Sequence, residues 1–450
     1  MIKENINLMI ALKNKNTPIN YEIVKSKIAK SGIKNIGKAS IRELVSLVNE
    51  IEQETNDKFI RMEMGVPGLA PPEIGTNAEI AALKTGVASK YPMIDGVAQL
   101  KDEISRFVKN FLNIEVNRKG CIPTVGSMQG GFAAFLMLTK LDAKKDTVLF
   151  IDPGFPVQKQ QLEVLDHKYD TFDVYNYRGD AIKDKLESFL SKGNISTIIY
   201  SNPNNPSWIC FTEKELKIIG ELATQYKAVV IEDMAYFGMD FRKDYSKPGQ
   251  PPYQPTVAKY TNNWILLISS SKAFSYAGQR VGMMVINDQL FNRSFESLNA
   301  IYGHPMFGHN LIYKVLYALS SGVTHSAQYG LAAMLKAVND GTFDFVEEVK
   351  IYGERAKVMK KLFIDNGFSI VYDKDEDKPL ADGFYFTFSY KNMTGEELLE
   401  RLLFYGISAI SLAITGSERT EGLRACVSQT KSSQFKDLEY RLKQFNKHYS

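Results

Sequence analysis

The sequence predicts an α/β protein, with a large domain built on a mostly parallel β-sheet between helices and a smaller α+β domain. Two observations predict the sheet: five near-continuous apolar runs, and helical patterns that alternate with them from about residue 76. Strands buried on both faces of a parallel sheet are apolar throughout, without polar alternation. A third observation is the length of 450 residues, which exceeds one compact unit of usual size and favours a second domain.

The elements of the large domain follow a loop rich in glycine and proline. Residues 39–53 place apolar side chains at helical spacing, and the loop MGVPGLAPP at 64–72 ends that pattern. The predicted strands beyond it are TVLFID (147–152), STIIYS (196–201), AVVIED (228–233), WILLIS (264–269) and GMMVIN (282–287).

The pattern changes after about residue 320. Residues 343–367 indicate one long helix that ends at Gly367, and further helices are predicted at 395–406 and 432–445. Strands are predicted at 368–373, 383–390 and 423–428. We therefore expect an N-terminal basic arm (1–38), a segment that packs with the small domain (39–75), a large domain (76–338) and a small domain (339–450).

Composition and charge indicate a cytoplasmic protein without a membrane span. The three cysteines are far apart and form no disulfide framework, and the longest apolar run, FAAFLMLTKL, is too short to cross a bilayer. The net charge is +4, of which residues 1–38 carry +6 with eight Lys and two Glu. That arm lacks Arg and interleaved aromatics, so we expect it to be solvated, with no nucleic-acid partner.

Polar clusters follow several of the predicted strands, in the sequences IDPGFP, YSNPNNP, IEDMAY and ISSSKAF. Ligands of open α/β sheets bind just beyond the carboxyl ends of the strands, so these clusters are candidates for one site. A lysine at such a strand end, Lys272, is costly unless it is paired or used covalently, although most lysines are solvated surface charges.

Each neighbouring candidate also has a simpler interpretation. Asp233 could cap a helix, Asn205 could form a turn, and Phe155 could belong to the core. The turn that contains Ser127 leads from a strand into a helix, whose first N–H groups suit a phosphate, but it fits neither a Walker loop nor GxGxxG.

One cofactor, pyridoxal 5′-phosphate (PLP), would account for the whole set. PLP needs an amine for its Schiff base, a carboxylate at its ring nitrogen and donors at its phenolic oxygen. It also needs an aromatic ring to stack on and a cup for its phosphate. Lys272, Asp233, Asn205 with Tyr236, Phe155, and Ser127 with Ser269 and Arg280 could fill these needs in turn.

Over residues 40–445 the chain resembles the class I/II aminotransferases, which are fold-type I PLP enzymes related to aspartate and aromatic aminotransferases. The matching motifs occur in the family's order, and the specific one is SxSK…GxRxG: MGVPG, YPMIDGVAQLKDEI, GSMQGG, DPGFP, NPNNP, DMAY, SSSKAFSYAGQRVG and LRACVS. The resemblance implies the fold type and an amino transfer between an α-amino acid and a 2-oxo acid by a ping-pong mechanism.

The resemblance also implies a role for each matching residue. Lys272 would carry PLP and shuttle the proton, Asp233 would hold the ring nitrogen, and Tyr236 would donate to the phenolic oxygen with Asn205. Further cofactor contacts are implied for Phe155, Ser127, the Met128 amide, Ser269 and Arg280, and substrate contacts for Gly65, Asn205 and Arg424. Tyr91 would reach the phosphate of a neighbouring subunit, which implies a homodimer with shared sites.

Three features depart from the family pattern. Ser207-Trp208 stands where most relatives have Thr-Gly, and the stretch from Val285 to about Val323 is longer than expected. The basic arm is also outside the pattern. In the long stretch, His304 and His309 are five residues apart and do not share a helix face, so we expect no metal site.

Two other functions remain open at this point. A PLP-dependent C–S β-lyase or amino-acid decarboxylase would keep every residue named above. A PLP-binding regulator would need an N-terminal DNA-binding domain, for which residues 1–38 are too short. The substrate side chain stays undecided, although the absence of an evident second arginine slightly favours aromatic or large neutral amino acids. For Arg424 the alternative role is a salt bridge within the small domain.

Overall fold

The computed structural model describes residues 16–450, which divide into two compact units. Unit 1 comprises residues up to Gly68, Tyr352–Asp373 and Asp382–Ser450, and unit 2 comprises Leu69–Ile351 and Lys374–Ala381. The boundaries lie at 68/69 and 351/352, where the sequence pattern suggested 75/76 and 338/339. None of the helices within residues 16–450 is long and apolar enough to cross a membrane.

Unit 2 contains a seven-stranded sheet in the order β2-β8-β7-β6-β5-β3-β4. Its strands are β2 (Cys121–Thr124), β3 (Thr147–Asp152), β4 (Lys168–Asp173), β5 (Ile195–Ser201), β6 (Val229–Met234), β7 (Trp264–Ser269) and β8 (Gly282–Ile286). Strand β8 is antiparallel to both of its neighbours, and every other pairing is parallel. The α/β fold with a mostly parallel sheet is therefore confirmed.

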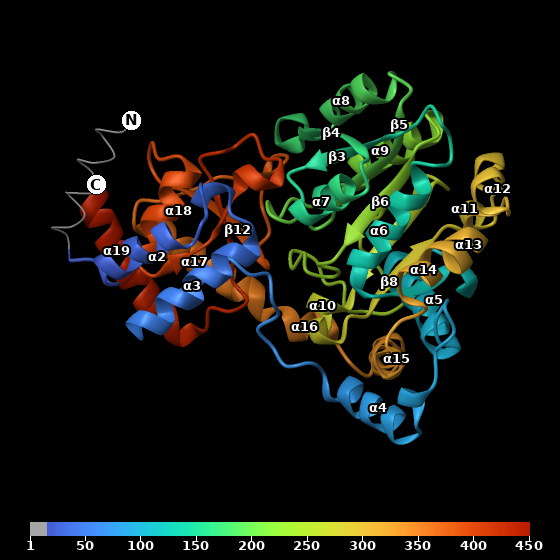
Figure 1. Ribbon diagram of the computed structural model, residues 1–450, viewed down its shortest axis with the longest axis horizontal. Helices are drawn as coiled ribbons and strands as arrows, with labels where there is room; N and C mark the ends of the chain where they lie inside the picture. Colours follow the sequence, from blue (N-terminus) through green and yellow to red (C-terminus); the bar gives the residue numbers. More distant parts are fainter. Residues whose placement is uncertain (1–15) are drawn as a thin grey trace. The chain divides into compact units, whose positions relative to one another are not determined.

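Helices cover the sheet of unit 2 (Figure 1). The longer ones are α4 (Glu73–Lys84), α5 (Ala98–Leu112), α6 (Gly126–Leu138), α7 (Pro156–Val164), α8 (Ala181–Leu190), α9 (Glu213–Gln225) and α15 (His325–Asn339). Shorter ones are α10 (Ser270–Ala273), α11 (Asp288–Phe291), α12 (Glu296–Tyr302), α13 (Phe307–Asn310), α14 (Tyr317–Ser320) and α16 (Phe345–Val349), with a π-helix over Leu311–Leu316.

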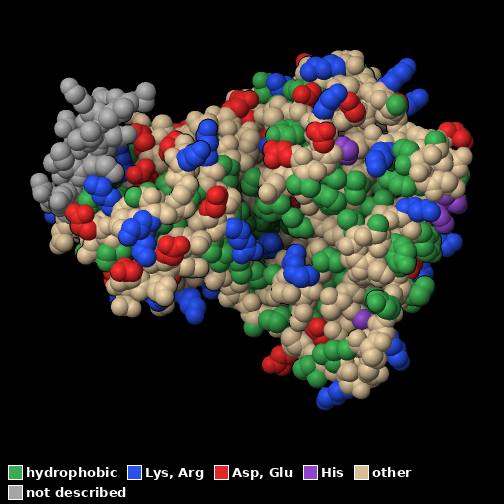
Figure 2. All heavy atoms as spheres, in the orientation of Figure 1, with side chains coloured by type: hydrophobic (Ala, Val, Ile, Leu, Met, Phe, Trp, Pro, Cys, Tyr) green, Lys and Arg blue, Asp and Glu red, His purple; other side chains and the backbone are tan. Residues whose placement is uncertain are grey.

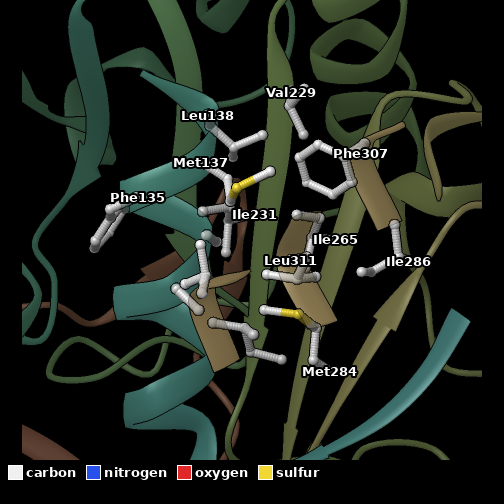
Figure 3. Packing of buried hydrophobic residues seen from close by; sticks show 14 of the residues in the cluster. Phe135, Met137, Leu138, Val229, Ile231, Ile265, Met284, Ile286, Phe307 and Leu311 are labelled. Carbon is white, nitrogen blue, oxygen red and sulfur yellow. The ribbon is translucent and has the colours of Figure 1, made fainter. Parts of the chain in front are cut away.

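The core of unit 2 shows why the strands are apolar throughout. Alternate residues of β6, β7 and β8 point to one face of the sheet, and there they pack against α6 and the segment that begins at α13 (Figure 3). The labelled members of this cluster include Phe135, Met137, Leu138, Ile231, Ile265, Met284, Ile286, Phe307 and Leu311. The intervening strand residues are buried on the other face. Because both faces of these strands are covered, their sequences do not alternate between apolar and polar residues.

Unit 1 contains a four-stranded antiparallel sheet in the order β14-β15-β12-β9 and a two-stranded pair, β1-β13. Its strands are β1 (Ile60–Arg61), β9 (Ser369–Ile370), β12 (Tyr385–Ser389), β13 (Ile407–Ser408), β14 (Ile410–Ser411) and β15 (Leu423–Cys426). Its helices are α2 (Tyr21–Lys30), α3 (Ile41–Thr55), α17 (Ile351–Asp365), α18 (Gly395–Leu403) and α19 (Phe435–Tyr449). The hairpin β10–β11 (Lys374–Asp375 and Lys378–Pro379) lies between two of these stretches in sequence but belongs to unit 2.

Two expectations about helices were wrong. The single helix over 343–367 is two helices, because α16 ends at Lys350, whose amide donates to Glu347 O three residues back. Residues 16–38 are not a solvated arm, since they contain α2 and a short 3-10 helix over Ile36–Lys38, and Tyr21 stacks on Phe404 with ring centroids 5.0 Å apart. The rest of the predicted arm, residues 1–15, lies outside the described residues.

Charged side chains of both signs are interspersed over the face drawn in Figure 2. Such a mixed surface produces no strong field of one sign there, as the small net charge of +4 leads one to expect.

Candidate active site

The sheet of unit 2 brings the predicted cofactor residues to one edge. Phe155, Asn205 and Lys272 follow the carboxyl ends of β3, β5 and β7, and Asp233 is the last but one residue of β6. Ser127 lies in the first turn of α6, directly after β2. Arg280 precedes the antiparallel strand β8, whose amino end lies at this same edge. The sheet therefore gathers residues that are up to 153 positions apart in the sequence, Ser127 and Arg280.

Asp233 is a buried carboxylate with few compensating contacts. Burial raises its pKa to about 6, while the positive charge of Lys272 and hydrogen bonds from the Ala235 amide (3.1 Å) and Gln158 Nε2 (2.8 Å) lower it. No helix follows Asp233, so the helix-cap interpretation is excluded. A carboxylate of this kind is poised to bind a cation or a protonated ring nitrogen.

Lys272 is half-buried in the short helix α10, close to an aromatic ring. Its Nζ lies 5.9 Å from the centroid of the Tyr236 ring, and Tyr236 itself is buried. The helix is capped by Ser269, whose side-chain oxygen accepts a hydrogen bond from the Ser271 amide (3.1 Å). A primary amine, a phenol and a buried carboxylate thus share one side of the sheet edge.

Asn205 lies in a loop that is hydrogen-bonded along its length. Its amide donates to the hydroxyl of Ser201 (3.1 Å), and the preceding Asn204 donates through Nδ2 to Pro153 O (2.8 Å) in the neighbouring loop. Asn205 and Asn204 are both buried. The Asn204 side chain therefore links the loop of Asn205 to the segment that carries Phe155.

Arg280 lies against the turn before α6, where two glycines allow a close approach. The Gly126 amide donates to Arg280 O (3.2 Å), and a Cβ on Gly126 would lie 2.6 Å from Arg280 Nη2. A Cβ on Gly282 would lie 2.7 Å from the Ser127 amide nitrogen, and Gly282 pairs with Ser269 across β7 and β8. Helix N-terminal amides and an exposed guanidinium are suited to a phosphate, and both glycines are needed for this close approach.

Two of the three predicted substrate residues, Gly65 and Arg424, lie together in unit 1, and both are close to Tyr385. The Arg424 guanidinium lies 4.6 Å from the Tyr385 ring centroid, and its Nη2 donates to Glu63 O (2.5 Å). A Cβ on Gly65 would lie 2.0 Å from the Tyr385 hydroxyl oxygen. The Glu63 carboxylate is bound by Arg61 (2.6 Å) and Ser408 (2.5 Å).

Sequence reasoning missed Gln158 and Tyr385. Gln158 carries no motif, but it stands three residues after Phe155, at a position of the first turn of α7 that faces Asp233. Tyr385 belongs to an apolar strand, GFYFTFSY, in which a buried tyrosine resembles any other core residue. Neither has a signal in a single sequence that would have identified it.

The long stretch after β8 contributes to the core and contains a histidine pair. Phe307 is fully buried in the cluster described above. His304 and His309 stack with ring centroids 3.7 Å apart, because the turn between α12 and α13 folds one back onto the other. Within residues 16–450 no group of three or more His, Cys, Asp or Glu side chains could hold a metal ion.

Comparison with known proteins agrees with this geometry. Residues 58–438 match the family described as aminotransferase class I and II. A Methanocaldococcus jannaschii protein named probable aspartate aminotransferase is 27% identical over 80% of this chain and 83% of that protein. An aspartate aminotransferase of Pyrococcus horikoshii is 26% identical over 57% of this chain and 61% of that protein.

A solved structure shows the same fold. The double mutant of the Thermus thermophilus aspartate aminotransferase superposes with a TM-score of 0.72 at 16% identity, over 94% of this chain and 98% of that one. The fold-type I prediction is confirmed by this likeness. Because the family match spans most of the chain, the chain belongs to the class I and II aminotransferases and is an aminotransferase enzyme.

Proposed function

We propose that unit 2 binds PLP at the edge of its sheet and that the enzyme moves an amino group between an α-amino acid and a 2-oxo acid. The observation that carries the proposal is the buried Asp233 carboxylate, with its pKa raised to about 6, on the same edge as the Lys272 amine. A cationic ring nitrogen would offset the burial of this carboxylate. The glycine-lined turn beside Arg280 suits the phosphate.

Each residue would have one task. Lys272 would hold the cofactor and, once released, carry a proton between the substrate Cα and C4′ of the cofactor. Asp233 would keep the proton on the ring nitrogen, and Tyr236 and Asn205 would donate to the phenolic oxygen. Phe155 would stack on the ring, while Ser127, the Met128 amide, Ser269 and Arg280 would bind the phosphate. When bound, PLP supplies an electron-accepting ring that stabilises the negative charge left at Cα.

The substrate would be held by unit 1. Arg424 would bind the α-carboxylate that all amino-acid substrates share, because a planar guanidinium matches two carboxylate oxygens. Its support on the Tyr385 ring and the Glu63 carbonyl would fix its orientation. Substrate contacts are also proposed for Gly65 in unit 1 and for Asn205 in unit 2.

The assembly would be a cytoplasmic homodimer. The Tyr91 side chain is 91% exposed, which suits a residue that reaches a neighbouring subunit. The three cysteines are free and buried, as suits a reducing compartment.

Borohydride reduction tests the cofactor site. The purified protein should be yellow, and reduction should fix PLP onto the peptide that contains Lys272. Lys272→Ala should still hold PLP without a covalent bond and should have no turnover. Recovery of the label on another lysine would contradict the proposal.

A half-reaction separates amino transfer from the other PLP reactions. The relatives carry aminotransferase names, which favours transfer over C–S β-lyase or decarboxylase chemistry. An amino donor alone should convert bound PLP to pyridoxamine phosphate and release the matching oxo acid. A screen of the standard amino acids, followed by the loss of visible absorption, would identify the side chain that the enzyme accepts.

A further inference from the structure

Trp208 has a backbone conformation that does not suit a tryptophan. Its φ is +67°, in the left-handed region where a Cβ crowds the following carbonyl oxygen. Glycine avoids that crowding, and other residues stay in this conformation only where their surroundings enforce it. The Trp208 side chain is nevertheless 1% exposed, so the loop turns a large ring inward.

The indole is directed at the tyrosine beside the lysine. The Trp208 and Tyr236 rings are edge-on, with centroids 5.3 Å apart and an interplanar angle of 66°. Tyr236 is 3% exposed, and its ring lies 5.9 Å from Lys272 Nζ. One ring therefore separates Trp208 from the amine at the centre of the site.

Hydrogen bonds fix the loop on the amino-terminal side of Trp208. The Trp208 amide donates to Asn204 O (3.0 Å), and the Asn204 amide donates to Ile209 O (2.8 Å). The Asn204 side chain accepts from the Ser207 hydroxyl (2.6 Å) and donates to Pro153 O (2.8 Å). These bonds close the turn around the left-handed residue.

A buried ionic cluster fixes the other side. The Cys210 amide donates to both carboxylate oxygens of Asp375 (3.1 and 3.2 Å), and Arg178 Nη2 donates to Cys210 O (3.1 Å). Asp375, in the hairpin β10–β11, is also paired with Arg178 (2.7 Å) and Arg242 (2.8 Å). The loop is thus anchored at two ends, with the strained residue between the anchors.

We infer that Trp208 is a positioning residue that fixes the Tyr236 hydroxyl toward the bound cofactor, and that the Asn204 and Asp375 contacts hold it in place. The inference rests on the proposed role of Tyr236. A hydrogen bond to the phenolic oxygen stabilises its negative charge, so a loosened donor raises the pH at which the bound cofactor loses its proton.

The test replaces the ring and measures a property other than turnover. Trp208→Leu, or Trp208→Met if the leucine variant unfolds, removes the ring and keeps apolar volume. The loss of an edge-on aromatic pair should change the proton-dissociation constant of the bound cofactor by roughly two- to tenfold. The pH midpoint of the change in visible absorption should therefore rise by about 0.3 to 1 unit. The dissociation constant of PLP should rise by a similar factor, and Trp208→Phe should restore both.

Two controls separate positioning from packing. Trp264 is 2% exposed at the start of β7, away from the lysine, so Trp264→Leu should lower the melting temperature without moving the pH midpoint. Tyr236→Phe should raise the midpoint by itself, and adding Trp208→Leu to it should add nothing.

The possible results separate the role inferred for Trp208 from the role proposed for Tyr236. If the midpoint rises in Tyr236→Phe but not in the Trp208 variants, only the role of Trp208 is overturned. Additive shifts in the double variant would overturn that role as well. Wild-type behaviour of Trp208→Gly, which relieves the backbone, overturns it as well. An unmoved midpoint in Tyr236→Phe overturns both assignments.

Discussion

At the scale of single residues, the partner of Asp233 decides how the site responds to pH. Gln158 is a neutral donor, so its hydrogen bond (2.8 Å) lowers the pKa of Asp233 without adding a charge that titrates itself. Burial is the larger effect and keeps that pKa at about 6. The carboxylate is therefore sensitive to the loss of any one donor.

Replacing Gln158 with leucine should make Asp233 harder to ionise. In the protein without cofactor, the pKa of Asp233 should rise further, by about half a unit to one unit, because the carboxylate loses a donor that favours its charged form. Gln160→Leu, an exposed position on the same helix, is the matched control. The measurement is an NMR titration of the Asp233 carboxyl in the cofactor-free protein, and an unchanged pKa in Gln158→Leu would contradict the expectation.

Arg424 can be tested against its alternative role in folding. An ammonium cannot reproduce a planar fork, and charge-assisted hydrogen bonds are worth about 1.5 to 3 kcal/mol each. Arg424→Lys should therefore lower kcat/KM by about a hundredfold or more, equally for all amino donors. PLP content and melting temperature should stay near wild type, and early unfolding or the loss of a single substrate would favour a structural or side-chain-specific role.

The residues predicted from motifs and those that were missed differ in kind. Lys272, Asp233 and Asn205 stand directly after apolar strands, and a parallel sheet brings such positions to one edge. Gln158 and Tyr385 act through contacts between elements that are far apart in the sequence. A single sequence contains the local pattern of each element but not the register in which two elements meet.

At the scale of elements, strands buried on both faces were predictable and edge strands were not. Strands β3, β5, β6, β7 and β8 coincide with apolar runs because each is covered on both faces. The edge strand β4 has the polar sequence KYDTFD and exposed positions, so it carries no apolar signal. The break at Lys350 was also unpredictable, because helical periodicity continues across it.

Strand β6 contains a second buried carboxylate, and it predicts how stability depends on pH. Burial raises the pKa of Glu232 to about 7, despite hydrogen bonds from Thr256 (2.6 Å), the Val257 amide (3.1 Å) and Asn202 (3.2 Å). Because the folded state holds this proton more tightly, its stabilisation is complete below the unfolded pKa of 4.5 and is lost as the pH rises through about 7.

In the protein without cofactor, the free energy of unfolding should therefore fall between pH 4.5 and 7. The contribution of Glu232 is at most about 3 to 4 kcal/mol, from about 1.4 kcal/mol for each unit by which its pKa is raised. In urea unfolding, Glu232→Gln should flatten the profile between about pH 6 and 7 and leave below pH 6 only the slope that Asp233 contributes. Asp233→Asn, the neighbour whose pKa is also raised, should reduce the slope below about pH 6 and leave it unchanged above that pH. An equal slope in wild type and Glu232→Gln would contradict the assignment.

At the scale of the whole molecule, the chain does not divide at simple boundaries. The hairpin Lys374–Ala381 belongs to unit 2, although the stretches on both sides of it belong to unit 1. Its Asp375 forms ion pairs with Arg178 and Arg242. No local pattern in the sequence predicts these partners, because they are far from Asp375 along the chain. The division of the remaining chain into a segment over 39–75, a large domain over 76–338 and a small domain over 339–450 stays a prediction.

The last prediction follows from the proposed homodimer and concerns Tyr91. If Tyr91 serves the neighbouring subunit's site, then a hybrid of a Tyr91→Phe subunit and a Lys272→Ala subunit has one site with both lesions and one with neither. Equal mixing makes half of the dimers hybrids, each with one intact site, so these intact sites should add roughly a quarter of wild-type activity to that of the two weakened parents. The control mixes Lys272→Ala with the Tyr91→Phe/Lys272→Ala double variant, which should recover nothing because every site lacks the lysine. The measurement is turnover after unfolding and refolding the mixture, with tagged subunits to isolate the hybrid. Hybrids no more active than their parents would place Tyr91 in its own subunit's site or in none.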